Sequence, residues 1–313
     1  MTLGATGTGD GWTQCAAGHR HWGRVGAAGL LLVAEGSALL QLRAAWSHEG
    51  GTWGIPGGAR DVAEDAVAAA LRETAEEAGV EVPPGAVTGE LSIDHGGWSY
   101  TTVLARVARR LPATPVDGES AALEWVPLDE VADRPLHPGL ADAWPLLRPA
   151  AGRRLRLVVD GANVVGSRPD GWWRDRRAAA ARLREELAGL RVPGAALPPE
   201  LGLPALQVWA PETVLVVEGA AAGLAAGPAV AGVRVVAASR TPGHRRGAGD
   251  DEVVHVVAAG RAAATDGPDG PDAQLVVTSD RELRRRCADQ GVPAVGTSWL
   301  RRLLEERRTP GGR

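Results

Sequence analysis

Apolar residues in the first half of the chain come in short runs separated by polar or glycine-rich stretches. Residues 25–34 and 38–43 are apolar enough to predict two neighbouring strands. Residues 86–94 and 98–108 alternate between apolar and polar positions, which predicts a second pair of strands. A short strand at 123–127 and helical segments at 129–131 and 139–147 complete this half. The pattern predicts a mixed sheet between helices.

The second half of the chain alternates predicted strands and helices. The strands are expected at 155–159, 213–217, 233–237, 274–277 and 293–295. The helices are expected at 176–190, 250–259, 281–289 and 298–307. Such alternation predicts a doubly wound α/β sheet, with loops rich in Pro and Gly at 191–204 and 265–272.

Between these two patterns lies an Arg-rich stretch, RPAAGRR at 148–154, that is typical of a join between domains. A length of 313 residues accommodates two domains that each bury a core. We therefore predict a disordered N-terminus at 1–11, a first domain at 12–148, a linker at 149–154 and a second domain at 155–313.

Residues 58–80 contain the stretch that says most about chemistry. A helix from about residue 64 to residue 78 would carry one packed stripe, made of Val67, Leu71, Thr74 and Ala78. The opposite face would carry Glu73, Glu76 and Glu77. Like charges three and four residues apart repel each other, and the chain has no Lys to relieve them. A solvated acidic face would account for three Glu residues; carboxylate ligands for Mg²⁺ are the alternative.

The spacing of these residues favours the metal site. Residues 58–80 fit the pattern G-x5-E-x7-R-E-U-x-E-E-x-G-U, where U is aliphatic. The fixed positions are Gly58, Glu64, Arg72, Glu73, Glu76, Glu77, Gly79 and Val80. This stretch resembles the Nudix box, and only Thr74 departs from it, at a position that is usually aliphatic. The resemblance implies an α/β/α sandwich with a mixed sheet.

The resemblance also implies hydrolysis of a nucleoside diphosphate linked to another group, with Mg²⁺ or possibly Mn²⁺ held by Glu73, Glu76 and Glu77. Metal-held phosphate oxygens and an activated water would supply the catalysis. In the family, the carbonyl of the Gly before the box, here Gly57, and a loop Glu often join the metal. Our candidates for that loop acid are Glu119 and, as its rival, Glu124.

Two arginines near the box have expected roles. Arg72 is placed to orient a carboxylate, with Glu64 as the partner of an ion pair. Arg43, at the end of the second strand, is a candidate phosphate contact, as Gly57 and Gly58 are for close backbone approach to a metal or phosphate. A nucleoside triphosphate, ordinary or damaged, is the favoured substrate and ADP-ribose the next; the general base is left open.

Acidic residues in the second half fall where an α/β sheet places its active site. Asp160 follows the first strand, Asp250 and Asp251 open a helix, and Asp280 follows a later strand. The stretches VVDGANVV, GDDEVV and VVTSDREL resemble the NYN branch of the PIN-like nucleases, with Asn163 at the family's Asn position. That resemblance implies acids that hold Mg²⁺ or Mn²⁺ for RNA cleavage. Helix capping by Asp160 and Asp280 is the alternative, and Asp250 and Asp251 are not ranked.

Charge is divided unevenly: residues 1–150 carry −9 and residues 151–313 carry +5, for a net charge of −4. A polyanion such as RNA would therefore meet the second half. The candidate phosphate contacts are Arg245, Arg246, Arg284 and Arg285. The absence of Lys and Phe indicates a GC-rich bacterial genome.

Two distant cysteines give no disulfide framework, and no apolar run approaches 18 residues. The N-terminus also lacks a basic segment followed by an apolar core. We therefore predict a cytoplasmic enzyme that joins a Nudix hydrolase to a NYN/PIN-like ribonuclease, without membrane segments. The alternative is that one of the two domains only senses a nucleotide or binds RNA. The oligomeric state is not predicted.

Overall fold

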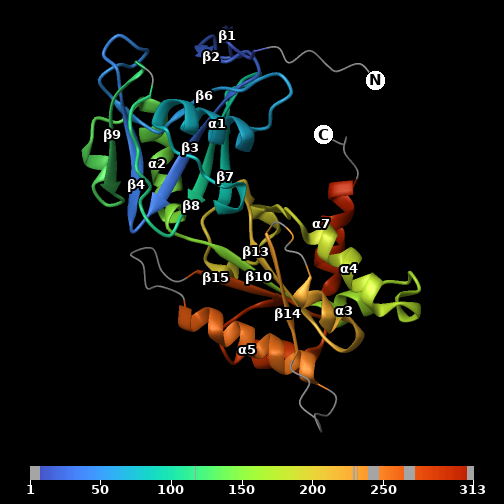
Figure 1. Ribbon diagram of the computed structural model, residues 1–313. Coiled ribbons are helices and arrows are strands. Elements are labelled where there is room, and N and C mark those ends of the chain that lie inside the picture. Colours follow the sequence, from blue (N-terminus) through green and yellow to red (C-terminus); the bar gives the residue numbers. More distant parts are fainter. Residues whose placement is uncertain are drawn as a thin grey trace. The chain divides into compact units, whose positions relative to one another are not determined.

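The computed structural model describes residues 8–116, 118–227, 230, 232–238, 247–263 and 272–308. The chain divides into two compact units (Figure 1). Unit 1 contains Met1–Gly152 with Pro204–Val208, and unit 2 contains Arg153–Leu203 with Trp209–Arg313. Most of the N-terminus expected to be disordered, most of the expected loop at 265–272, and the expected RNA contacts Arg245 and Arg246 lie outside the described residues.

Unit 1 is built on a mixed sheet. Its central strand β3 (Ala27–Ala34) is buried throughout and pairs in parallel with β8 (Ser99–Arg106). Antiparallel pairings join β7 (Val87–Asp94) to β8, β4 (Ser37–Arg43) to β3, β5 (Trp53–Gly54) and β9 (Ser120–Pro127) to β4, and β6 (Gly57–Ala59) to β3. The mixed α/β fold and the pairing of the two alternating segments are confirmed.

Helices and short elements complete unit 1. Helix α1 (Ala66–Ala78) packs on β3, β6 and β8, while α2 (Pro138–Ala151) packs on β8. The remaining elements are the hairpin β1 (Trp12–Gln14) and β2 (Arg20–Trp22) and the 3₁₀ helices η1 (Pro84–Ala86) and η2 (Val131–Asp133). Helix α2 continues to Ala151, so only residues 152–154 separate it from the first strand of unit 2.

Unit 2 contains a five-stranded sheet in which every pairing is parallel. The order is β14 (Val233–Ala237), β13 (Glu212–Val217), β10 (Leu155–Asp160), β15 (Ala273–Val277) and β16 (Ala294–Val295). The chain leaves β10 on one side and returns on the other, so the order reverses between β10 and β15. In open α/β sheets, ligands bind outside the carboxyl ends of the strands at such a reversal.

Helices surround this parallel sheet. Helices α5 (Ala248–Ala263) and α6 (Arg281–Ala288) bury one face, in a core of Val158, Val214, Val216, Val253, Val256, Val257, Val276, Leu283, Cys287 and Val292. The short helix α3 (Gly161–Gly166) and α4 (Arg176–Leu187) contact β13, and α5 runs along the other side of the sheet (Figure 1). The other elements are η3 (Trp172–Arg174), β11 (Val192–Pro193), η4 (Gly194–Ala196), η5 (Pro199–Leu201), β12 (Val208–Trp209), η6 (Gly219–Ala226) and α7 (Thr297–Arg308).

Candidate active site

Helix α1 carries the acidic residues of unit 1. The Asp65 carboxylate caps its first turn by accepting from the Ala68 amide at 2.8 Å, and Gly79 ends it in the left-handed region with φ 64°. Thr74 is fully buried, and its hydroxyl donates to the Ala70 carbonyl at 2.7 Å. The polar group at the usually aliphatic position is therefore satisfied within its own helix.

The expected division of α1 into an apolar and an acidic face is wrong for Glu77. Glu77 is only 5% exposed, on the same side as Thr74 and Ala78. Residues 74, 77 and 78 share one stripe at a step of 100° per residue. The Glu77 Oε2 accepts from the backbone amide of Gly57 at 2.9 Å. This carboxylate therefore faces the glycine turn that connects β5 and β6 to the helix.

Arg72 holds the other carboxylates of the box. Its Nε and Nη2 donate to both carboxylate oxygens of Glu64, at 3.0 and 2.9 Å. Its Nη1 donates to Glu73 at 2.8 Å and to Glu76 at 3.0 Å. Hydrogen bonding to Arg72 lowers the pKa of Glu64. One guanidinium thus relieves the like-charge repulsion along α1.

Glu73 is the carboxylate that burial perturbs. Burial raises its pKa, and the hydrogen bond from Arg72 opposes this shift. A side chain at position 58 would conflict with Glu73, because a Cβ built there lies 2.6 Å from its carboxylate atoms. Gly58 therefore leaves the space that Glu73 occupies beside β6.

Arg43 is at the end of β4 and, like Glu77, is close enough to Tyr100 to affect its pKa. Its Nε donates to the His48 carbonyl at 2.9 Å. The pKa of the partly exposed Tyr100 is raised by desolvation and then by Glu77, and Arg43 opposes that shift. Tyr100 is thus close to both Glu77 and Arg43. Sequence reasoning missed Tyr100, although it is the only Tyr in the chain.

The two candidates for the loop acid occupy different settings. Glu119 is exposed in the loop directly before β9, and its carbonyl accepts from the Ala44 amide at 2.8 Å. Glu124 lies within β9, paired with Leu40 of β4, and its carboxylate forms an ion pair with Arg134 at 2.8 Å. Glu119 alone has the loop position that the resemblance implies.

Asp160 is the central acid of unit 2. It lies at the carboxyl end of β10 and is 8% exposed. One carboxylate oxygen accepts from the Asn163 amide at 3.1 Å and so caps α3, while the other accepts from the Thr278 hydroxyl at 2.9 Å. Burial raises its pKa, and Glu218 and Asp280 raise it further.

Asn163 and Asp280 connect the ends of β10 and β15. The Asn163 Oδ1 accepts from the Ser279 amide at 2.8 Å, and Asp280 caps α6 by accepting from the Leu283 amide at 2.8 Å. Asp160 and Asp280 thus both cap helices, and Asp280 is also close enough to Asp160 to raise its pKa. Asp160 and Asp280 can therefore cap helices and also belong to one group of acids.

The structure distinguishes Asp250 from Asp251. Burial raises the pKa of Asp250, and Asp160 and Asp280 raise it further. Asp251 forms an ion pair with Arg286 on α6 at 2.7 Å. Asp250 therefore belongs with Asp160 and Asp280. Glu218, after β13, raises the pKa of both Asp160 and Asp250 and was missed by sequence reasoning.

The donor chemistry of both groups suits a hard divalent cation, because carboxylates predominate. In unit 1, Glu73 and Glu76 both contact one nitrogen of Arg72, so they converge on a single positive group. Within the described ranges, no three His, Cys, Asp or Glu side chains already lie in a metal-binding arrangement. A metal held by Glu73 and Glu76 would therefore share these carboxylates with Arg72.

No helix in the described part of the chain is long and apolar enough to span a membrane. Both cysteines, Cys15 and Cys287, are buried thiols without a disulfide.

Residues 23–147 match the model of the NUDIX domain. A Mycobacterium tuberculosis protein named "Putative 8-oxo-dGTP diphosphatase 3" is 51% identical over 155 residues, covering 46% of this chain and 71% of the relative. A Bifidobacterium longum "Nucleoside triphosphate pyrophosphatase/Nudix hydrolase fusion protein" is 43% identical over 146 residues, covering 44% of this chain and 30% of the relative.

Among solved structures, a Nudix hydrolase from M. smegmatis, RenU, is 47% identical and covers 45% of this chain and 93% of its own, with a TM-score of 0.40. Nudix hydrolases generally use divalent metal ions such as Mg²⁺ and act on nucleotides. The matched residues contain the whole of α1 and its glycine turn. The chain therefore belongs to the Nudix hydrolase family.

Proposed function

We propose that unit 1 is a metal-dependent pyrophosphohydrolase whose substrate is a nucleoside triphosphate, ordinary or oxidised. One observation carries this proposal: Glu73 and Glu77 of α1 lie against a glycine turn, and Arg72 contacts both Glu73 and Glu76. The name of the Mycobacterium tuberculosis relative supports an oxidised guanine nucleotide as the first substrate to try. ADP-ribose is the second candidate.

Glu73, Glu76 and Glu77 would hold Mg²⁺, with the Gly57 carbonyl and Glu119 as further oxygen ligands. The bound metal would neutralise phosphate oxygens and lower the pKa of an attacking water. The Gly57 amide holds Glu77 in place, and Arg72 positions Glu73 and Glu76. Arg43 would bind a phosphate.

For a triphosphate, the oxygen of water forms a bond to one phosphorus. The bond from that phosphorus to the bridging oxygen breaks, and the leaving pyrophosphate or phosphate takes the electron pair. The protons of the water pass to a base and to solvent. The products are a nucleoside phosphate and the released phosphate group.

The test is a substrate panel with the full chain and Mg²⁺. The panel contains 8-oxo-dGTP, dGTP, the other nucleoside triphosphates, ADP-ribose, a dinucleoside polyphosphate and a nucleotide sugar. Products are separated by chromatography, and kcat/KM is compared between substrates. A triphosphate with the highest kcat/KM supports the proposal. A large preference for a dinucleoside polyphosphate or a nucleotide sugar would overturn the substrate assignment.

We further propose that unit 2 is a metal-dependent ribonuclease of the NYN/PIN-like kind. The supporting observation is that acids from separate segments gather at the carboxyl end of a parallel sheet, where Glu218 and Asp280 add to the effect of burial in raising the pKa of Asp160 and Asp250. Acids at such a sheet edge suit a divalent metal and a phosphodiester. The alternative is that this unit binds RNA without cleaving it, as a non-catalytic module.

Cleavage of a labelled RNA by the full chain in Mn²⁺ or Mg²⁺ tests the second proposal. Asp160→Asn should abolish cleavage and keep RNA binding, because the change removes a carboxylate and retains a helix cap. Equal cleavage by the Asp160→Asn variant would contradict it. RNA binding without cleavage by the unaltered chain would favour the non-catalytic alternative.

A further inference from the structure

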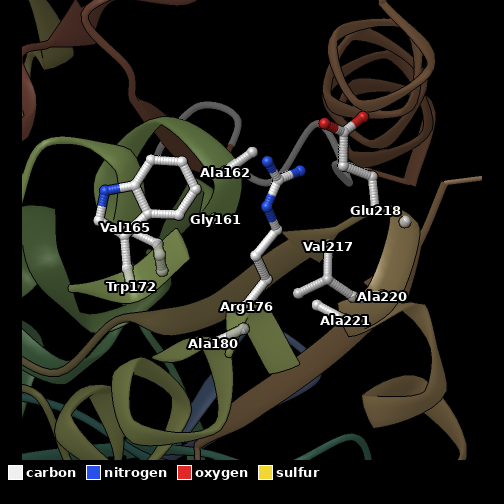
Figure 2. Close-up of a pocket in the computed structure, with 11 residues that line it drawn as sticks. Gly161, Ala162, Val165, Trp172, Arg176, Ala180, Val217, Glu218, Ala220 and Ala221 are labelled. Carbon is white, nitrogen blue, oxygen red and sulfur yellow. The ribbon is translucent and has the colours of Figure 1, made fainter. Parts of the chain in front are cut away.

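A cavity of about 210 Å³ lies beside the acids of unit 2, between the carboxyl ends of β10 and β13. Gly161 and Ala162, which follow Asp160, form one wall, and Glu218 forms the opposite one (Figure 2). Glu218 also raises the pKa of Asp160 and Asp250. The cavity and the acidic group therefore share a wall.

Helix α3 approaches β13 closely beside the cavity. A Cβ at Gly161 would lie 2.5 Å from the Val216 carbonyl oxygen, so a larger residue would push the helix away from the strand. On the β13 side, the lining after Glu218 consists of Gly219, Ala220 and Ala221. Small residues on this wall leave room for a flat group.

The third wall carries an aromatic ring and a cation. Trp172 lines the cavity, and the guanidinium of Arg176 lies between Ala162 and Glu218 (Figure 2). The Arg176 Cζ is 5.3 Å from the centre of the Trp172 ring. Within the described part of the chain, Arg176 forms no ion pair, although it is exposed and close to Glu218. Its charge is thus available to an anion that enters the cavity.

The size of the cavity restricts what it can hold. Cavities for complete small-molecule ligands have volumes of about 300–1,000 Å³. A cavity of about 210 Å³ is better matched to one unit of a longer ligand. Aromatic rings stack on bases of any sequence, and arginine pairs with phosphates. One nucleotide of an unpaired strand meets all three requirements.

We propose that this cavity binds one nucleotide of a single-stranded nucleic acid, with its base against Trp172 and its phosphate on Arg176. The next phosphodiester of the strand then reaches Asp160 and its neighbouring acids. Arg176 turns from the Trp172 ring to the phosphate on binding. That the nucleic acid reaches Asp160 and its neighbours rests on the ribonuclease proposal. Binding of a nucleotide in the cavity does not require cleavage.

The experiment measures binding of a short fluorescein-labelled single-stranded RNA, and of a DNA of the same sequence, to the full chain in EDTA. Fluorescence anisotropy gives Kd at several salt concentrations. Arg176→Gln and Trp172→Ala should each weaken binding about tenfold or more, and Trp172→Phe should restore most of it. Arg176→Gln should also lower the slope of log K against log salt by about one.

Arg177→Gln is the matched control, because Arg177 is an exposed neighbour on the same helix that does not line the cavity. Its Kd should stay within about twofold of the unaltered chain, the range expected for a surface change. Equal losses for Arg176→Gln and Arg177→Gln would overturn the proposal by showing only general charge attraction. Unchanged binding by Arg176→Gln and Trp172→Ala, or no binding of either strand by the unaltered chain, would also overturn it.

Cleavage is measured separately in Mn²⁺, so the two proposals can fail independently. Binding that depends on Arg176 and Trp172 without any cleavage supports the cavity and contradicts the ribonuclease. If RNA is cleaved and the Kd is unchanged in Arg176→Gln and Trp172→Ala, nucleotide binding in the cavity is contradicted and ribonuclease activity is supported. The RNA and DNA strands show which sugar the site prefers, and thermal melting confirms that each variant is folded.

Discussion

The two acidic groups of this protein are assembled in different ways. In unit 1, Glu73, Glu76 and Glu77 lie within one turn and a half of a single helix, and Arg72 of the same helix neutralises part of their charge. In unit 2, the acids come from four segments that are far apart in sequence. Neutral groups, the Thr278 hydroxyl and the Asn163 amide, hydrogen-bond to Asp160.

This difference predicts different responses to a bound metal. In unit 1, Glu73 and Glu76 already contact a cation, so a bound metal would share them with Arg72. Burial raises the pKa of Asp160 and Asp250, and nearby acids raise it further, so charge at these two carboxylates remains unfavourable until a cation binds. The first group should therefore depend on a metal for activity, and the second should depend on it for stability as well.

The largest expected effect is on hydrolysis by unit 1. Glu76→Gln or Glu77→Gln should lower kcat for nucleotide hydrolysis by about 10³-fold, because a lost metal ligand removes several kcal/mol of transition-state stabilisation. Far-ultraviolet circular dichroism should show a folded chain. Gln at position 77 can still accept from the Gly57 amide, so it keeps that contact. Near-normal turnover at saturating Mg²⁺ would contradict the metal assignment.

The next effect tests the internal cation of unit 1. Arg72→Gln should lower the free energy of unfolding by about 2 kcal/mol in EDTA, because Glu64, Glu73 and Glu76 lose a partly buried partner. Saturating Mg²⁺ should restore part of this loss. Thermal melting with and without Mg²⁺ measures both quantities. An equal loss in both conditions would show that metal and guanidinium do not share these carboxylates.

A smaller effect distinguishes the two loop acids. Glu119→Gln should lower kcat/KM about tenfold through loss of an outer oxygen ligand, about 1.4 kcal/mol in the transition state. Glu124→Gln is the matched control, since it removes only the ion pair with Arg134. Kinetics at several Mg²⁺ concentrations measure both. The reverse order of effects would assign the role to Glu124.

The smallest effect concerns the stability of unit 2. Burial raises the pKa of folded Asp160 above its unfolded value of about 3.9, so the folded state binds more protons. In EDTA, the free energy of unfolding should therefore fall as pH rises from about 4 through the raised pKa. Asp160→Asn should reduce this loss and stabilise unit 2 at pH 7.

Hydrogen exchange of the β10 amides, corrected for intrinsic rates, measures this stability separately from unit 1. Asp175→Asn is the control, because Asp175 also caps a helix, by accepting from the Ala178 amide at 2.9 Å, but lies outside the acidic group. If the stability of the Asp160→Asn variant falls with pH as steeply as that of the unaltered chain, the raised pKa of Asp160 is not the cause.

Sequence reasoning succeeded where the pattern is local. The buried runs at β3 and β10 and the alternation of β7 and β8 predicted strands, and α1 follows from its spacing. It failed on Glu77, because a charged residue was assumed to avoid the packed side of the helix. The Gly57 amide, brought close by the turn, is what makes its burial possible.

The acids of unit 2 were only partly predictable, because their grouping depends on the whole sheet. Glu218 follows the buried run of β13, and an acid directly after such a run was the available signal. Asp250 and Asp251 are adjacent, so the sequence does not show which of them faces the sheet edge. The ion pair of Asp251 with Arg286 depends on the packing of α5 against α6.

The position of the Glu73 carboxylate depends on Gly58, whereas the fold around it does not. The Gly58 backbone is not in the left-handed region, and the atoms nearest to a methyl group there belong to the Glu73 carboxylate and not to the backbone. An alanine at this position would displace the carboxylate while the strands and α1 stay in place. A single inherited methyl group could thus leave cells with a normal amount of a folded protein that has lost its chemistry, a defect that abundance measurements would not detect.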